Sequence, residues 1–87
     1  MTRQNLTKDE RYVLSLFEMA KEMGELTASL DKYAAGDRIG IHQKSVNNIC
    51  KLLIQANFIK KEGESSVVFT SRGLSLAEKL LDQKTNF

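Results

Sequence analysis

Apolar residues recur at helical spacing in several stretches of this chain. One face of the first stretch carries Val13, Leu16, Phe17 and Ala20. This 3.6-residue spacing is typical of an amphipathic helix. Just before it, Thr7 and Glu10 match a capping box, in which both side chains satisfy backbone donors at a helix start. Gly24 suits the left-handed conformation that ends many helices. The pattern therefore predicts a loose tail over 1–6, followed by a helix from about residue 8 to about Met23.

A second helix is expected over about Leu30–Arg38. Its inward residues are expected to be Leu30, Tyr33 and Ala34. The connector before it, Glu25–Ser29, leaves room for a short strand at Leu26–Thr27. A tight turn is expected around Gly40, because two isoleucines flank that glycine.

The third helix is expected from about Gln43 to Ala56. Its buried stripe consists of Val46, Ile49 and Leu53. Asn57 follows it and tolerates a positive φ better than most residues. Short strands over Phe58–Lys61 and Ser66–Phe69 then flank a turn, because the second is rich in β-branched and aromatic residues.

Thr70 is placed to cap a last helix over about Ser71–Gln83, followed by a loose end over 84–87. Its inward residues are expected to be Leu74, Ala77, Leu80 and Leu81. The expected fold is mainly α with a small β-hairpin (α+β), in one domain over 7–83.

The outward face of the third helix changes this plain picture. It offers Gln43, Lys44, Ser45, Asn47, Asn48 and Lys51. Residues 43–61 contain four lysines and no acid, whereas the whole 87-residue chain has a net charge of only +2. Such a cluster of positive charge is typical of a surface that binds polyanions. The simpler alternative is a solvated face with a chance excess of lysine.

Several motifs in this order resemble the winged helix-turn-helix family, and within it the MarR-like repressors. The resemblance covers about residues 8–83. It is carried by the turn at 35–41, the buried stripe of the third helix, the exit at 52–59 and the Phe-Thr-Ser-Arg-Gly run at 69–73. It implies a three-helix core with a wing and a C-terminal helix, and a small transcriptional regulator that binds double-stranded DNA sequence-specifically.

The chain departs from the family pattern at a few positions. Gly36 stands where helix two crosses the third helix, and Asn57 stands where glycine is usual. His42 takes the place of a Ser or Thr cap. Glu62 and Glu64 lie in the wing, which argues more against a wing contact with phosphates than against a helix contact.

The resemblance places the first turns of the third helix in a major groove. The residues expected at base edges are Gln43, Lys44, Ser45, Asn47 and Asn48, since amides pair with adenine and lysine with guanine. The residues expected at phosphates are Lys51, Lys60, Lys61 and Arg72. Operator symmetry would require a homodimer, for which the chain offers its first and last helices.

Two other functions stay open. A winged helix can be a protein-interaction module, whose acidic wing would contact a basic partner, and the same lysines would suit structured RNA. No enzyme, cofactor or metal is expected, because there is no second histidine, Cys–His pair or Gly-rich phosphate loop. His42 is expected to be a turn residue and Cys50 a core residue. Without a membrane-length apolar run or a secretion signal, a cytoplasmic location is expected.

Overall fold

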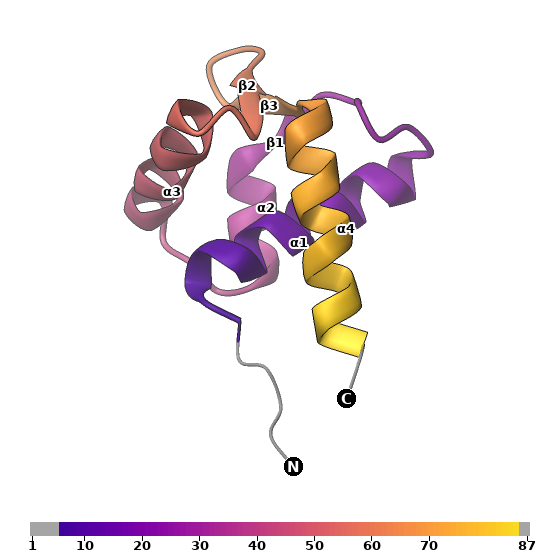
Figure 1. The fold of residues 1–87 in the computed structure, drawn as a ribbon. Coiled ribbons are helices and arrows are strands. Elements are labelled where there is room, and N and C mark those ends of the chain that lie inside the picture. Colours follow the sequence, from indigo (N-terminus) through magenta and orange to yellow (C-terminus); the bar gives the residue numbers. More distant parts are fainter. Residues whose placement is uncertain (1–5, 86–87) are drawn as a thin grey trace.

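The computed structural model describes residues 6–85, which form four helices and a small three-stranded antiparallel sheet (Figure 1). In chain order the elements are α1 (Lys8–Met23), β1 (Leu30–Asp31), α2 (Lys32–Arg38), α3 (Gln43–Gln55), β2 (Ile59–Lys61), β3 (Ser66–Phe69) and α4 (Ser71–Thr85). The expected mainly helical α+β class is confirmed. Of the loose ends expected over 1–6 and 84–87, residues 1–5 and 86–87 lie outside the described residues. The described parts differ from the prediction, because Leu6 packs against the core and residues 84 and 85 belong to the last helix.

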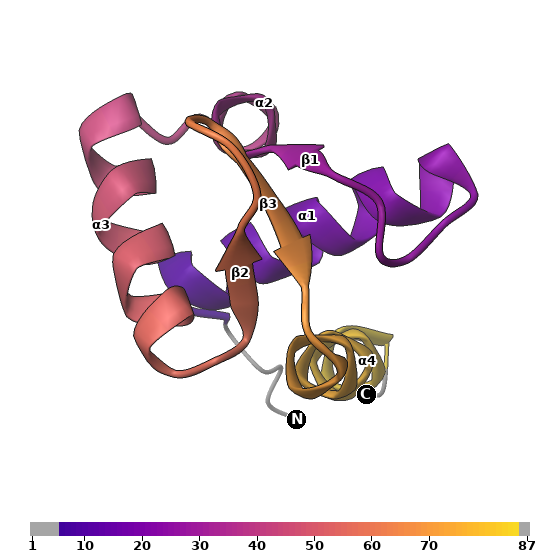
Figure 2. The ribbon, with the colours of Figure 1, turned by 90° about the horizontal axis from the view of Figure 1, so that it is seen from above.

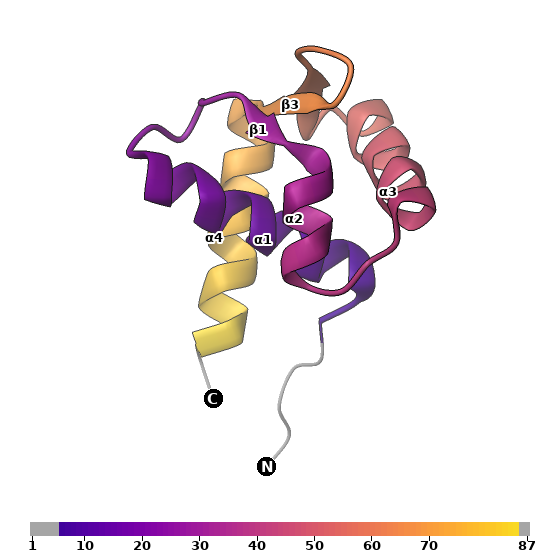
Figure 3. The ribbon, with the colours of Figure 1, turned by 180° about the vertical axis from the view of Figure 1, so that it is seen from behind.

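Helix α1 forms the centre of the molecule, between α2 and α4 (Figures 1 and 3). Its predicted start is confirmed, because the Glu10 amide donates to Thr7 Oγ1 over 3.1 Å and the Thr7 amide donates to Glu10 Oε1 over 2.8 Å. Gly24 ends it with φ +78°. Because α1 is covered on two sides, it buries seven residues, with Tyr12, Leu16 and Ala20 at 0% exposure.

The sheet has the order β1-β3-β2 and lies above α1, with α3 and α4 on either side of it (Figure 2). The hairpin register pairs Ile59 with Phe69, and Leu30 of β1 pairs with Val67. The return strand has its predicted bounds. The first hairpin strand begins one residue later than predicted, because Phe58 still belongs to the turn out of α3 and donates its amide to Leu53 O over 2.9 Å.

The prediction for the segment before α2 was wrong in two ways. No strand forms at Leu26–Thr27, and the strand lies instead at Leu30–Asp31. Buried Leu30 pairs with β3, and the Lys32 amide donates to Ser65 O over 2.9 Å. Asp31 then caps α2, because its side chain accepts hydrogen bonds from the amides of Tyr33 and Ala34. The helix therefore begins only at Lys32.

The inward face of α2 is also different from the predicted one. Ala35 and Gly36 are buried, whereas Tyr33 and Ala34 are half-buried. The reason is the crossing with α3: a Cβ at Gly36 would lie only 2.3 Å from Val46 Cγ2. The two helices therefore approach more closely than a larger side chain would allow.

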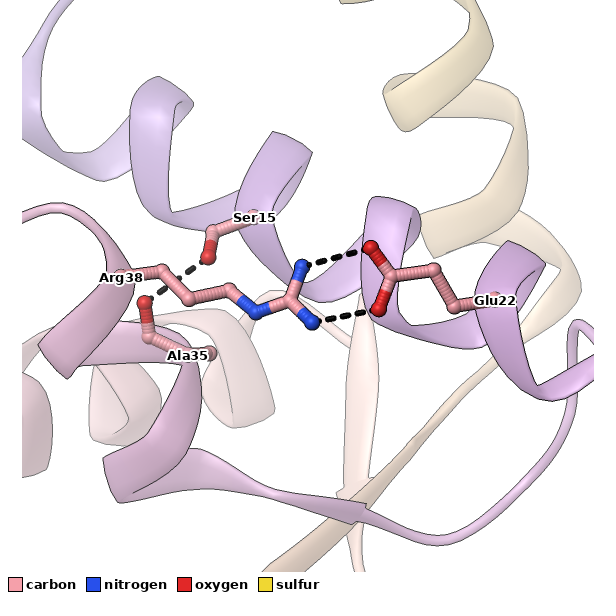
Figure 4. A network of polar contacts seen from close by, with 4 residues as sticks. All are labelled: Ser15, Glu22, Ala35 and Arg38. Carbon is pink, nitrogen blue, oxygen red and sulfur yellow. Dashed lines mark hydrogen bonds and ion pairs between the residues drawn. The ribbon is translucent and has the colours of Figure 1, made fainter.

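Figure 4 shows two of the polar contacts that join α1 to α2. The Ser15 hydroxyl donates to Ala35 O over 2.8 Å inside the core. At the surface, the Arg38 guanidinium donates to both carboxylate oxygens of Glu22 over 2.5 and 3.0 Å. These contacts fix α2, and hence the platform on which α3 rests.

The rest of the helical pattern matches the predictions closely. Helix α3 buries its predicted stripe and ends one residue early, and Asn57 adopts the predicted positive φ of 67°. The Thr70 hydroxyl accepts from the Gly73 amide over 3.0 Å at the start of α4. Helix α4 runs two residues beyond its predicted end, to Thr85. Among its predicted inward residues, Ala77 and Leu80 are buried, and the other two are half-buried. No helix within residues 6–85 combines the length and apolar character needed to cross a membrane.

Candidate nucleic-acid interface

Helix α3 lies at one edge of the molecule and is covered on one face only (Figures 1 and 2). That face buries Val46, Ile49, Cys50 and Leu53 against the core. The other face is open to solvent. It carries the predicted residues Gln43, Lys44, Asn47, Asn48 and Lys51, all exposed, while Ser45 is half-buried. The structure therefore places five of these six side chains where a large ligand can reach them.

A hollow of about 370 Å³ separates α3 from the β2–β3 hairpin. Lys51 lines it from α3 and Lys61 lines it from β2, so the structure brings together two of the predicted phosphate residues. Lys32 of α2 lines it as well, and the sequence interpretation missed this third lysine. Lys32 directly follows Asp31 in the sequence, and no pattern there marks it as part of this group of lysines. Its contribution depends on how α2 sits beside the hairpin.

Two other predicted phosphate residues lie outside this hollow. Lys60 is exposed, and because side chains alternate along a strand it projects to the opposite side of β2 from Lys61. Arg72 stands in the first turn of α4, where its guanidinium lies 5.6 Å from the centre of the Phe58 ring. Two of the four predicted phosphate residues therefore line the hollow, and the other two do not.

Asn47 is held by a residue that the sequence interpretation placed in the core. The Tyr33 hydroxyl reaches from α2 and donates to Asn47 Oδ1 over 2.9 Å. Tyr33 is itself fixed, since its amide donates to the Asp31 cap and the Lys32 ammonium lies 5.2 Å from its ring centre. No sequence pattern signals this bond, because it joins residues fourteen apart across a helix crossing.

Carboxylates border this face but do not lie on it. Asp9 at the start of α1 shares a shallow depression of about 260 Å³ with Asn48 of α3, and Lys8 lies beside it. Glu64 of the hairpin turn borders the larger hollow. In the larger hollow three lysines outnumber Glu64, whereas Lys8 and Asp9 balance each other in the smaller depression.

The second half of α3 is less polar than the first. Leu52 is 56% exposed and Ile54 is 39% exposed. Around the helix axis their side chains lie on either side of Lys51. Neither residue belongs to the predicted buried stripe of Val46, Ile49 and Leu53, and the structure confirms that they lie outside it. The polar donors are thus concentrated in the first two turns.

Beneath this face the polar groups are neutral. The Tyr12 hydroxyl donates to Lys32 O over 2.8 Å and lies 3.3 Å from Cys50 Sγ. Burial raises the pKa of both Tyr12 and Cys50 above their ordinary values. The thiol is therefore protonated at neutral pH and packs as a core group, as predicted. Exposed His42 precedes α3 and makes no side-chain cap bond.

Within the part of the chain that the structure describes, no three His, Cys, Asp or Glu side chains gather closely enough to hold a metal ion. Comparison with known proteins finds no matching family model, no matching curated protein and no matching solved structure. What α3 can bind therefore follows from its own side chains, a row of exposed amides and ammonium groups.

Proposed function

We propose that this chain is a small winged helix-turn-helix protein of the MarR-like type that binds double-stranded DNA sequence-specifically and acts as a transcriptional regulator. The observation that carries the proposal is the open face of α3, whose first turns present amides and lysines and no carboxylate. Such groups match base edges and phosphates in a groove that admits a helix.

The arrangement of the elements supports the winged-helix part of the proposal. In chain order they run helix, strand, helix, helix and two hairpin strands, and β1 pairs with β3 at the edge opposite β2. Helices α2 and α3 meet at the close contact between Gly36 and Val46. In a winged helix the hairpin beside α3 would be the wing.

In this proposal the first turns of α3 lie in the major groove. Gln43, Lys44, Asn47 and Asn48 would face base edges, with half-buried Ser45 at the margin. Lys51 and Lys61 would face phosphates across the hollow, joined by Lys32. Lys60 and Arg72 would contact phosphates only outside this hollow.

A homodimer is the assembly that a two-fold symmetric operator requires, with half-sites about 34 Å apart. Helices α1 and α4 pack on each other within the chain. Leu76 and Leu81 of α4 remain half-buried, and they are the apolar side chains that a second copy would cover. Sedimentation with and without a palindromic duplex tests this, since a protein that stays monomeric on such DNA would contradict it.

The proposed function is tested by titrating the protein into a fluorescent random-sequence duplex at 50 to 200 mM salt. If about four phosphates are neutralised, the affinity should fall roughly 100-fold over this range. Absent or salt-independent binding would contradict DNA binding. A duplex RNA of the same length in the same titration tests the RNA alternative, which a clear preference for RNA would favour.

Replacing Asn47 with alanine tests base reading. We expect Asn47→Ala to weaken binding to a preferred site by about 1–3 kcal/mol and to leave affinity for random DNA nearly unchanged. Gln83→Ala is the matched control, because Gln83 is an exposed amide on α4 and does not line the hollow beside α3. Equal losses on both DNAs would count against Asn47 as a base-reading residue.

One observation favours the alternative of a protein-interaction module. Leu52 and Ile54 expose apolar surface on the second half of α3, and DNA contacts do not need it. The acidic side chains of the hairpin turn would then face a basic partner. Under this alternative DNA binding is absent, and Leu52→Ser abolishes capture of the partner without changing the stability of the fold.

A further inference from the structure

We propose that Tyr33 is a positioning residue that decides which base Asn47 reads, so that Asn47 selects guanine or thymine rather than adenine. This inference rests on the proposed function and deepens it. Its starting point is the 2.9 Å hydrogen bond in which the Tyr33 hydroxyl donates to Asn47 Oδ1. Asn47 is exposed on the face of α3 that would enter the groove.

The preference follows from the two ends of an amide side chain. Asparagine pairs with adenine by accepting at Oδ1 and donating from Nδ2 at the same time. The hydrogen bond from Tyr33 draws Oδ1 towards α2. Because the oxygen and the nitrogen diverge from one carbon, the amino group is then the end that points away from α2. Asn47 is thereby presented as a donor.

A donor suits base edges that offer only acceptors. In the major groove guanine offers N7 and O6 and thymine offers O4, whereas the adenine edge combines an acceptor with an amino donor. The adenine amino group would need Oδ1 to face the base, and although this oxygen can accept a second hydrogen bond, its bond to Tyr33 turns it towards α2. Guanine and thymine make no such demand, so they are the bases that this amide fits.

Tyr33 is well placed to impose this orientation. Its backbone amide donates to Asp31 Oδ1 over 2.9 Å at the cap of α2. The Lys32 ammonium lies over its ring at 5.2 Å from the centre. The ring is half-buried, so its hydroxyl is held in place before any DNA arrives. A side chain whose rotamer is fixed by packing supports such an orienting role.

The first test needs no DNA. Tyr33→Phe removes the donor, and we expect the two Asn47 side-chain amide proton signals in a nitrogen-correlated NMR spectrum to shift. The matched control is Tyr12→Phe, which removes the same atom from a tyrosine that contacts Lys32 O and Cys50 instead. Asn47 signals that move equally in both variants, or in neither, would overturn the proposal.

The second test selects preferred sites from a pool of random duplexes. Asn47→Ala identifies the position that Asn47 reads, since only that position should lose its preference. The unaltered protein should prefer guanine or thymine there. At that one position, Tyr33→Phe should raise the preference for adenine over guanine or thymine by roughly fivefold to a hundredfold. This is the range of discrimination that one good bidentate contact provides. The other positions of the site should keep their preferences.

The outcomes separate this inference from the proposed function. A site with adenine at that position in the unaltered protein, or the same base with Tyr33→Phe, overturns the inference while DNA binding stands. A pool that yields no preferred site overturns it as well, because Asn47 then reads nothing. Loss of all salt-dependent duplex binding is the failure of the proposed function, and the inference falls with it.

Discussion

At the residue scale, single atoms decide how closely α3 approaches its platform. Gly36 lies where α2 crosses α3, and Val46 opposite it is 1% exposed. The glycine weakens α2 by about 1 kcal/mol relative to alanine. In return, the absence of a side chain at Gly36 permits the close crossing of the two helices. The residue was singled out from its place in the motif, and the structure adds the neighbour that excludes a larger side chain.

We expect Gly36→Ala to destabilise the protein by up to about 2 kcal/mol net, since overpacking costs about 1–3 kcal/mol and the better helix propensity of alanine returns about 1 kcal/mol. The added Cβ would meet Val46 Cγ2 at 2.3 Å. Urea unfolding measures the change. Gly63→Ala is the control, because a Cβ there meets only Ser66 atoms at 3.9 Å. If Gly36→Ala costs as much in a Val46→Ala background, the clash is not the cause.

At the scale of the elements, α1 and α2 are joined by polar contacts both inside the core and at the surface (Figure 4). In the exposed contact, hydrogen bonds from Arg38 lower the pKa of Glu22 below its ordinary value. A carboxyl whose pKa is lowered by folding stabilises the folded state above its ordinary pKa. That stabilisation is lost as the pH falls through the lowered pKa. It also means that Arg38 is engaged within the fold and is not part of the cationic face.

We therefore expect Glu22→Gln to lower the free energy of unfolding at pH 7 and to have no such effect well below pH 4. The loss is small, because both side chains are in contact with solvent. Urea unfolding of both proteins at pH 7 and pH 3 measures it. The matched control is Glu62→Gln in the exposed hairpin turn. A difference that persists unchanged at pH 3 would show that the charge of Glu22 is not responsible.

At the scale of the whole molecule, the charge is arranged in space as well as in sequence. Lysines from α2, α3 and β2 surround one hollow beside the exposed face of α3. Lys21 of α1 and Glu78 of α4 together line a separate depression, where the lysine is accompanied by carboxylates. A polyanion would therefore meet a concentrated positive potential on one side, although the net charge is only +2.

From this arrangement we expect that the position of a lysine matters more for DNA binding than the total charge of the protein. We expect Lys51→Gln with Lys61→Gln to weaken binding to random duplex DNA and to reduce its salt dependence by about two phosphate contacts. The control, Lys21→Gln with Lys79→Gln, removes the same charge from α1 and α4. Titrations at several salt concentrations compare the pairs. Equal effects would indicate attraction by net charge alone and would count against a defined interface.

Local patterns in the sequence were enough to predict which stretches are helices, where most of them begin and end, and which side of α3 is polar. These features depend on local physics: the Thr7 capping box, the stripe of Val46 and Leu53, and the tolerance of Asn57 for a positive φ. Such signals act within a few residues and can be read from spacing.

Only the tertiary structure decided the start of α2, the third lysine of the hollow and the bond between Tyr33 and Asn47. Leu30 becomes a strand because β3 offers it a partner thirty-seven positions later in the chain. The other two features exist because α2 crosses α3 beside the hairpin. Contacts between distant segments depend on how the elements pack together, and no local pattern of side chains carries that information.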